Sequence, residues 1–441
     1  MKKIIILLLF PAFIVAQIVD FELEESWSVY DIQDFFLFAG LPSYVGEINY
    51  AVDAYSVIYM TPNEHGELVE ASGVVFLPVD ASCPSPILSW QHGTVVSDNG
   101  APSKNIENQT IGIVSASHGY IVFMSDYLGL GEGEGFHNYC HAETEASAVI
   151  DLILEGKDFA AERGVLSSDQ LFLMGYSQGG HATMATVKEI ESNYSNDLSI
   201  TASAPMAGPY SMSEAQAIML NTIYPNPGYF PYVIFAYDNV YGNIYNEPSD
   251  VLKPGFSDLF PWYDGTKSMT QINDTILEIA QNLYGIDALN FTPMDMIQED
   301  YYEAYQNDSN HPFQLALEEN DLIDFLPDSP MQIIHCNGDN DVSFENAVMA
   351  YNAFSLAEDV ALIDGGNYDH GQCASMSIIA AKLFFDTKAN FCNDLSVSEL
   401  NVRNEIIKVF DLFGRTVKGV NKSNLTIKLH QDGSVQKIIN F

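Results

Sequence analysis

The chain has 441 residues, of which 47% are hydrophobic and 17% are charged. This composition can build a sizeable buried core and excludes a largely disordered protein. Acidic residues outnumber basic ones by 59 to 17, and residues 17–393 hold 54 of the acids but only eight basic residues. Such a surface repels nucleic acid and anionic membranes, so we expect neither as a partner.

Residues 1–16 begin with Lys2 and Lys3, continue with a short apolar run and end on a small residue, Ala16. This order is typical of a secretory signal peptide. The apolar run is shorter than the roughly 20 residues that a membrane helix needs, although a retained anchor is the alternative. The sequence therefore predicts a protein that is secreted or held at the cell surface.

Export would permit disulfides among the five cysteines. Cys373 and Cys392 flank one helical segment, and we predict a bridge between them. Cys336 lies inside an apolar run and is predicted to be a buried free thiol. The cysteine spacing is not that of a zinc site.

Residues 48–59 and 68–77 alternate between apolar and polar positions, which predicts an antiparallel start to a sheet. Runs typical of buried strands follow at residues 86–90, 120–125, 170–176, 200–206, 331–335 and 360–363. Helix-length segments lie between most of them, at residues 106–117, 143–163, 179–192 and 344–357. Strands that alternate with helices predict an α/β protein with a mostly parallel, doubly wound sheet.

Residues 210–328 interrupt this alternation and are too long for a simple crossover. They contain 12 of the 24 tyrosines, with helical stretches at 268–283 and 293–306. We predict an inserted, mainly helical cap, some of whose aromatic side chains line an apolar pocket. Beyond residue 393 the composition changes, and alternation at 405–413 and 424–429 predicts a small β appendage over residues 393–441.

The string Gly175-Tyr176-Ser177-Gln178-Gly179-Gly180 contains the pattern G-x-S-x-G. An apolar run precedes it and a helix-compatible segment follows it. In that context the serine stands on a sharp turn between a strand and a helix, with its hydroxyl exposed at the top of the sheet. The pattern predicts that Ser177 is a nucleophile, and the alternative is an ordinary Gly-Ser turn.

A serine nucleophile needs a base to take its proton and an acid to orient that base. On such a turn the chain order is serine, acid, histidine. His370 follows the strand at 360–363 and is the predicted base. Asp339 and Asp341 both follow the strand at 331–335, and we favour Asp341 as the acid. Either aspartate could instead be a turn former.

An oxyanion needs hydrogen-bond donors that are already in place. One predicted donor is the backbone N–H of Gln178. The other comes from Gln91-His92-Gly93-Thr94, which follows the strand at 86–90, and Thr94 is our choice. We expect His92 to hold this loop by hydrogen bonds.

Several strings together resemble the α/β-hydrolase superfamily, especially its secretory lipases and esterases with a large helical cap. These strings are Gln91-His92-Gly93-Thr94, Asp126-Tyr127-x-Gly129-x-Gly131, the Ser177 pattern, Asp341 and His370. The resemblance covers roughly residues 45–390 and implies a hydrolase domain over residues 17–392. Ser343 stands where the family has a proline, which leaves Asp339 open as the acid.

The resemblance implies Ser177 as nucleophile, His370 as base, Asp341 as its orienter, and Thr94 and Gln178 as oxyanion donors. It implies hydrolysis of carboxylic esters, with a small-molecule ester or lipid as substrate and no metal or other cofactor. A serine peptidase of the same fold and a non-catalytic binding module at the cell surface are the alternative functions.

The C-terminal segment resembles the sorting domain that the type IX secretion system reads. The resemblance lies in residues 407–417 and in the ending Lys437-Ile438-Ile439-Asn440-Phe441. It implies that residues 393–441 contact the secretion machinery and are cleaved on export.

Overall fold

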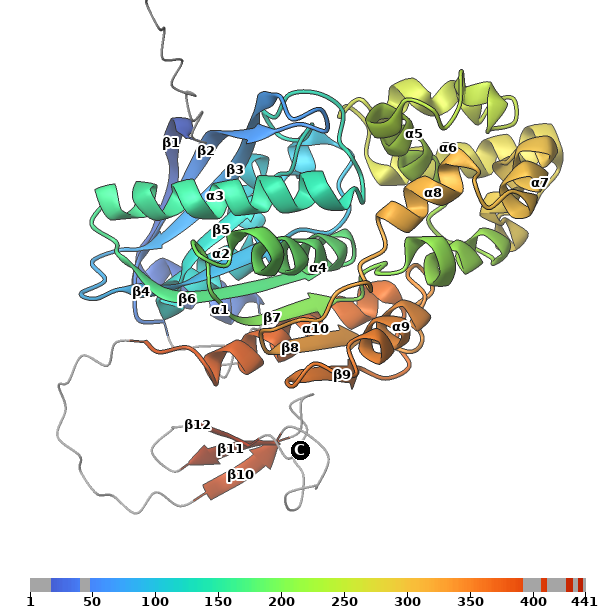
Figure 1. The fold of residues 1–441 in the computed structure, drawn as a ribbon. Coiled ribbons are helices and arrows are strands. Elements are labelled where there is room, and N and C mark those ends of the chain that lie inside the picture. Colours follow the sequence, from blue (N-terminus) through green and yellow to red (C-terminus); the bar gives the residue numbers. More distant parts are fainter. Residues whose placement is uncertain (1–16, 40–47, 392–405, 411–425, 431–434, 439–441) are drawn as a thin grey trace, which may run out of the picture. The chain divides into compact units, whose positions relative to one another are not determined.

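The computed structural model describes residues 17–39, 48–391, 406–410, 426–430 and 435–438 (Figure 1). The predicted signal peptide, residues 1–16, lies outside the described residues, as does most of the predicted appendage. The main body and the segment after residue 392 are separate units, and each is described by itself.

The body is built on a nine-stranded sheet with the order β1-β2-β3-β5-β4-β6-β7-β8-β9. The strands are β1 (Ile18–Trp27), β2 (Val52–Pro62), β3 (Leu68–Pro78), β4 (Ser85–Gln91), β5 (Ile121–Ser125), β6 (Ser167–Tyr176), β7 (Ile200–Met206), β8 (Met331–His335) and β9 (Val360–Asp364). Pairing is antiparallel from β1 through β3 to β5 and parallel from β5 to β9. The predicted mostly parallel sheet with an antiparallel start is therefore confirmed.

Helices cover both faces of this sheet (Figure 1). They are α2 (Thr110–His118), α3 (Ala142–Glu162), α4 (Gln178–Glu189), α9 (Glu345–Ala353) and α10 (His370–Asp386). Gly112 of α2 lies against the Phe76 ring, and Gly156 of α3 lies against the Phe123 ring. Phe123 pairs with Val75, the neighbour of Phe76, so the two rings point to opposite faces. The sheet is thus doubly wound.

The chain between β7 and β8 is helical and lies beyond the carboxyl ends of the parallel strands (Figure 1). Its main helices are α5 (Tyr229–Tyr241), α6 (Met269–Ile279), α7 (Glu299–Asn307) and α8 (Pro312–Glu319). Phe235, Phe256, Ile272 and Phe291 are buried in a second core, to which Val96, Tyr139 and Cys140 from outside the segment also belong. The single helix predicted over residues 293–306 is broken, since a short turn at Pro293–Met296 precedes α7.

Two N-terminal elements were not predicted. Strand β1 lies at the edge of the sheet, pairs with β2 alone and has mostly exposed side chains. Helix α1 (Val29–Ala39) follows it and buries Ile32 and Phe36.

The C-terminal unit contains an antiparallel sheet of β10 (Ile406–Phe410), β11 (Thr426–His430) and β12 (Val435–Ile438). The first two strands coincide with the alternating runs in the sequence. Among the described residues, none of the helices combines the length and the apolar character that crossing a membrane requires.

Candidate active site

Ser177 stands between the last residue of β6 and the first residue of α4. Its backbone has φ 63° and ψ −123°, a left-handed conformation that residues with a side chain rarely adopt. The Ser177 N–H donates to the carbonyl of Met206, the last residue of β7, over 2.9 Å. The strand-turn-helix arrangement expected around Ser177 is present.

The turn requires glycine on both sides of Ser177. A Cβ at Gly175 would overlap the carbonyl oxygen of Gly179, and a Cβ at Gly179 would overlap that of Gln91. The turn is therefore packed against itself and against the loop that follows β4.

His370 and Asp339 continue from Ser177 in a line of hydrogen bonds. His370 is the first residue of α10, and its Nε2 lies 2.9 Å from Ser177 Oγ. Its Nδ1 lies 2.6 Å from Asp339 Oδ2. The hydroxyl of Tyr176 donates to the His370 carbonyl over 2.6 Å, which ties the start of α10 to the end of β6.

The prediction of Asp341 as the partner of His370 is corrected by this arrangement. The backbone N–H groups of Asp341 and Val342 both donate to Asp339 Oδ1 over 2.9 Å. These bonds fold the loop so that the second oxygen of Asp339 faces His370. Asp341, two residues farther along, points elsewhere.

Asp341 joins this loop to the helical segment between β7 and β8. Its Oδ2 accepts a hydrogen bond from Asn226 Nδ2 over 2.8 Å. Its carbonyl oxygen accepts from the Tyr224 hydroxyl over 2.9 Å and from Gln216 Nε2 over 3.1 Å.

The two carboxyl groups differ in their preferred protonation state. Burial acts to raise the pKa of Asp339, but hydrogen bonds from His335 and His370 outweigh it and hold that pKa well below its usual range. Burial raises the pKa of Asp341, whose Oδ1 has no hydrogen-bond partner among the described residues. Asp339 is thus the carboxylate that stays charged beside the imidazole.

The loop after β4 also lies close to Ser177. A Cβ placed on Gly93 would lie 3.7 Å from Ser177 Cβ. In the described part of the chain, the backbone N–H groups of Thr94 and Gln178 have no hydrogen-bond partner, which leaves both predicted donors available. His92 holds the loop as predicted, with Nδ1 2.7 Å from the Gly93 carbonyl and Nε2 3.2 Å from that of Asp126.

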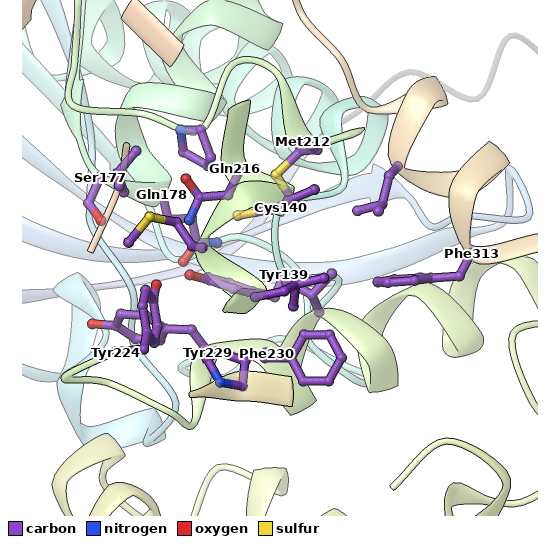
Figure 2. Close-up of a pocket in the computed structure, with 18 residues that line it drawn as sticks. Tyr139, Cys140, Ser177, Gln178, Met212, Gln216, Tyr224, Tyr229, Phe230 and Phe313 are labelled. Atoms are coloured by element: carbon purple, nitrogen blue, oxygen red, sulfur yellow. The ribbon is translucent and has the colours of Figure 1, made fainter. Parts of the chain in front are cut away.

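A cavity of about 720 Å³, its open mouth included, lies beside Ser177 and Gln178 (Figure 2). Most of its walls come from the helical segment between β7 and β8, and most are apolar. The lining residues include Met212, Met219, Leu220, Tyr224, Tyr229, Phe230, Val233 and Phe313. Apolar walls with a few polar groups beside the nucleophile suit an apolar organic ligand.

Comparison with solved structures places this arrangement among known folds. A putative hydrolase from Legionella pneumophila is 26% identical with a TM-score of 0.75, covering 87% of this chain and 100% of its own. The rice cell wall degrading esterase LipA from Xanthomonas oryzae is 26% identical with a TM-score of 0.74, covering 84% of this chain and 99% of its own. The protein is a hydrolase with the α/β-hydrolase fold.

A more distant structure and a family model match the hydrolase less completely. Candida antarctica lipase A shares the fold at 16% identity, with a TM-score of 0.60 and 85% of this chain and 83% of its own covered. The family model of the prolyl oligopeptidase family matches residues 108–216. This range includes Ser177 but does not reach Asp339, Asp341 or His370. No curated protein matches the chain.

A buried polar network that the sequence did not reveal supports Gln178. Gln178 Nε2 lies 2.8 Å from Glu145 Oε1 and 2.7 Å from His137 Nε2. Burial lowers the pKa of His137 to about 3, so this ring is neutral and its Nε2 can accept. Glu145 also accepts from His181 Nδ1 over 2.7 Å and from the Cys140 N–H over 3.2 Å.

Cys140, Glu145 and His181 are residue types that bind metals, and their ligand atoms lie within 4.8 Å of one another. However, Glu145 already accepts three hydrogen bonds from the protein. The hydrolase therefore satisfies this buried carboxylate without an ion.

The cysteine pairing also differs from the prediction. Cys336 and Cys373 form a disulfide, so Cys336 is not a free thiol and Cys373 is not bonded to Cys392. Cys336 lies three residues before Asp339, and Cys373 lies three residues after His370.

Sequence reasoning also missed His335, the last residue of β8. Its Nε2 lies 3.1 Å from Asp339 Oδ2. A histidine at the end of an apolar strand gives no signal in the sequence that separates it from a buried core residue.

Proposed function

We propose that the hydrolase is a serine carboxylic-ester hydrolase that works through an acyl-enzyme. The observation that carries the proposal is the line of hydrogen bonds from Ser177 through His370 to Asp339 beside an apolar cavity. The similarity to the esterase LipA supports ester hydrolysis.

In the first step, Ser177 Oγ attacks the ester carbonyl while His370 Nε2 takes the serine proton. Asp339 accepts the hydrogen bond from His370 Nδ1 and stabilises the imidazolium that forms. The N–H groups of Gln178 and Thr94 donate to the oxyanion. His370 then protonates the departing alcohol, and the acyl group remains on Ser177.

In the second step, a water molecule takes the place of the alcohol. His370 removes a proton from that water as it attacks the acyl carbonyl. The intermediate collapses, Ser177 recovers its proton from His370, and the acid leaves. The apolar walls of the cavity favour esters with an apolar acyl or aryl group as substrates.

Replacement of the nucleophile tests the proposal. Ser177→Ala should lower kcat on p-nitrophenyl esters by about 10⁶-fold, as removal of a triad serine does elsewhere. It should also abolish labelling by a fluorophosphonate probe. Ser147→Ala is the control, because Ser147 is a half-buried serine of α3. This variant should keep both the hydrolysis of p-nitrophenyl esters and the labelling by the probe. Undiminished hydrolysis by the Ser177→Ala protein would refute the assignment.

A serine peptidase is the second candidate, because the prolyl oligopeptidase family model matches the segment around Ser177. Parallel assays on p-nitrophenyl esters and aminoacyl-arylamides separate the two activities. We expect kcat/KM for the esters to be the larger. A wild-type protein that neither hydrolyses esters or amides nor reacts with the probe would instead favour a non-catalytic binding module.

We further propose that the hydrolase is exported, with residues 1–16 as a signal peptide and residues 393–441 as a sorting segment for the type IX machinery. In a host that has this machinery, the full chain should reach the medium or the cell surface. A chain lacking residues 393–441 should remain in the periplasm. Equal export of both would contradict the role of the segment.

A further inference from the structure

We propose that His335 is a positioning residue that shares the Asp339 carboxylate with His370 and thereby sets the pH at which the site becomes active. The proposal rests on the proposed function, because it concerns the acid of that catalytic group. His335 takes no part in the mechanism above, which uses Ser177, His370 and Asp339 alone.

The carboxylate of Asp339 is fully enclosed and receives four hydrogen bonds. Two backbone N–H groups donate to Oδ1 over 2.9 Å. Oδ2 lies 2.6 Å from His370 Nδ1 and 3.1 Å from His335 Nε2. The Asp339 side chain is 0% exposed, so water cannot replace a donor that is lost. The hydrogen bond from one imidazole therefore weakens the electrostatic attraction between Oδ2 and the other imidazole.

The surroundings of His335 decide where its proton lies. The ring is 0% exposed and packs edge-on against Phe344, with 5.5 Å between ring centroids. Its Nδ1 has no partner within the described ranges. A second proton there would bury an unpaired N–H, whereas a bare Nδ1 leaves only an acceptor unpaired. The geometry therefore assigns the donor role to His335 Nε2, which points its proton at Asp339.

This extra donor changes how the site responds to acid. The charge on Asp339 favours the protonated form of His370, which is inactive as a base in the free enzyme. A second donor on the same oxygen draws away part of that charge. Without it, His370 would meet the full charge of Asp339 and would keep its proton to a higher pH.

Other groups also lie near this pair, and all of them are retained in a protein in which only His335 is replaced. Asp341 lies on the same loop, and Asp369 precedes His370 at the start of α10, where it accepts from the Gln372 N–H. From β6, the Tyr176 ring contacts His370 with 5.0 Å between centroids. The Cys336–Cys373 disulfide beside them does not titrate.

The test compares His335→Asn with His335→Gln in the full chain. The glutamine amide nitrogen can occupy the place of the imidazole Nε2, whereas the shorter asparagine cannot reach Asp339. The half-point on the acid side of the kcat/KM profile for a p-nitrophenyl ester should rise by roughly half to one pH unit in His335→Asn. It should return close to the wild-type value in His335→Gln.

The rate of Ser177 labelling by a fluorophosphonate should show the same shift, whichever acyl group the natural substrate carries. Equal half-points in all three proteins, or equal shifts in both variants, would overturn the proposal. Wild-type protein that neither hydrolyses esters nor labels would overturn the proposed function, and with it the role of His335.

The position of the His335 proton can also be measured in the wild-type protein, so this test does not depend on whether a variant folds. In protein labelled with ¹⁵N-histidine, one buried ring should carry its proton on Nε2 alone from pH 5 to pH 8. This signal should persist in Ser177→Ala. A His335 ring protonated on both nitrogens, or on Nδ1 only, would contradict the sharing of Asp339.

Discussion

Asp339 and Asp341 show how two identical side chains on one loop acquire different tasks. Asp339 is held by the N–H groups that follow it and faces His370. Asp341 faces Asn226, and its other oxygen has no partner in the part of the chain that the structure describes. Only the first of these surroundings favours a carboxylate that stays ionised beside an imidazole.

Exchange of each aspartate for asparagine should separate the two. Asp339→Asn should lower kcat by about 10⁴-fold, because the amide no longer holds His370 in the productive tautomer. Asp341→Asn should keep kcat within about tenfold of wild type, because no hydrogen bond joins this residue to His370. Steady-state kinetics at pH 8 measure both.

Thermal unfolding provides the control for this pair. Burial raises the pKa of Asp341, so its ionisation opposes folding as the pH rises. The Asp341→Asn protein should therefore be at least as stable as wild type at pH 8. If Asp341→Asn were the inactive variant and Asp339→Asn the active one, the sequence-based choice would be restored.

The sequence was sufficient to predict the placement of Ser177 and His370, because a motif or a strand end marks each of them. It could not decide between the aspartates, because both follow the same strand. The choice depends on which way the loop turns, and two backbone N–H groups determine that. His335 went unnoticed because a histidine inside an apolar run looks like a core residue.

Among the structural elements, the loop after β8 and the first turn of α10 are joined covalently. The Cys336–Cys373 disulfide closes a loop of 37 residues that contains α9 and β9. It links the segment that carries Asp339 to the one that carries His370.

Removing this link should weaken the fold. The double variant Cys336→Ala/Cys373→Ala should lose about 3–4 kcal/mol of unfolding free energy, because its unfolded chain is less constrained. Denaturant unfolding measures the loss. Mass mapping of non-reduced peptides supplies the control, and a Cys373–Cys392 peptide in place of Cys336–Cys373 would contradict the pairing.

Helix α5 contributes a wall of the cavity and allows a matched test of the acyl site. Val233 lines the cavity, whereas Val240 on the same helix does not. Val233→Trp should lower kcat/KM for long acyl esters roughly ten- to hundredfold by filling space, and it should affect acetate esters little. Val240→Trp should leave the chain-length preference unchanged. An equal effect of both substitutions would argue against this wall.

Strands β4 to β8 were largely predictable because their apolar runs are mostly buried on both faces. Strand β1 was not, because Asp20, Glu22 and Glu24 make it read as surface. It pairs with β2 at the edge of the sheet, and its Phe21 ring packs edge-on against Phe159 of α3. The break before α7 was hidden by good helix formers on both sides of it.

At the scale of the whole molecule, the net charge of −42 is the dominant feature. Repulsion among so many acids opposes the compact state, and salt screens it over a Debye length of about 10 Å at 0.1 M. The charge follows from composition alone, so this property was fully predictable from the sequence.

The melting temperature should therefore rise by several degrees when NaCl increases from about 0.02 to 0.5 M, most steeply at the low end where the Debye length changes fastest. Differential scanning calorimetry at pH 8 checks this. Sucrose, which is uncharged, should not reproduce the steep initial rise. A melting temperature that is flat or falls with NaCl would show that local ion pairs outweigh the general repulsion.

The insertion of the helical segment between β7 and β8 has a practical consequence for directed evolution. The side chains proposed for bond cleavage lie on the sheet and its loops, while most of the cavity wall lies in residues 207–330. A mutant library confined to that segment should yield many clones with altered acyl preference. Its designers would need to keep Gln216, Tyr224 and Asn226, which anchor the segment to the loop of Asp339 and Asp341.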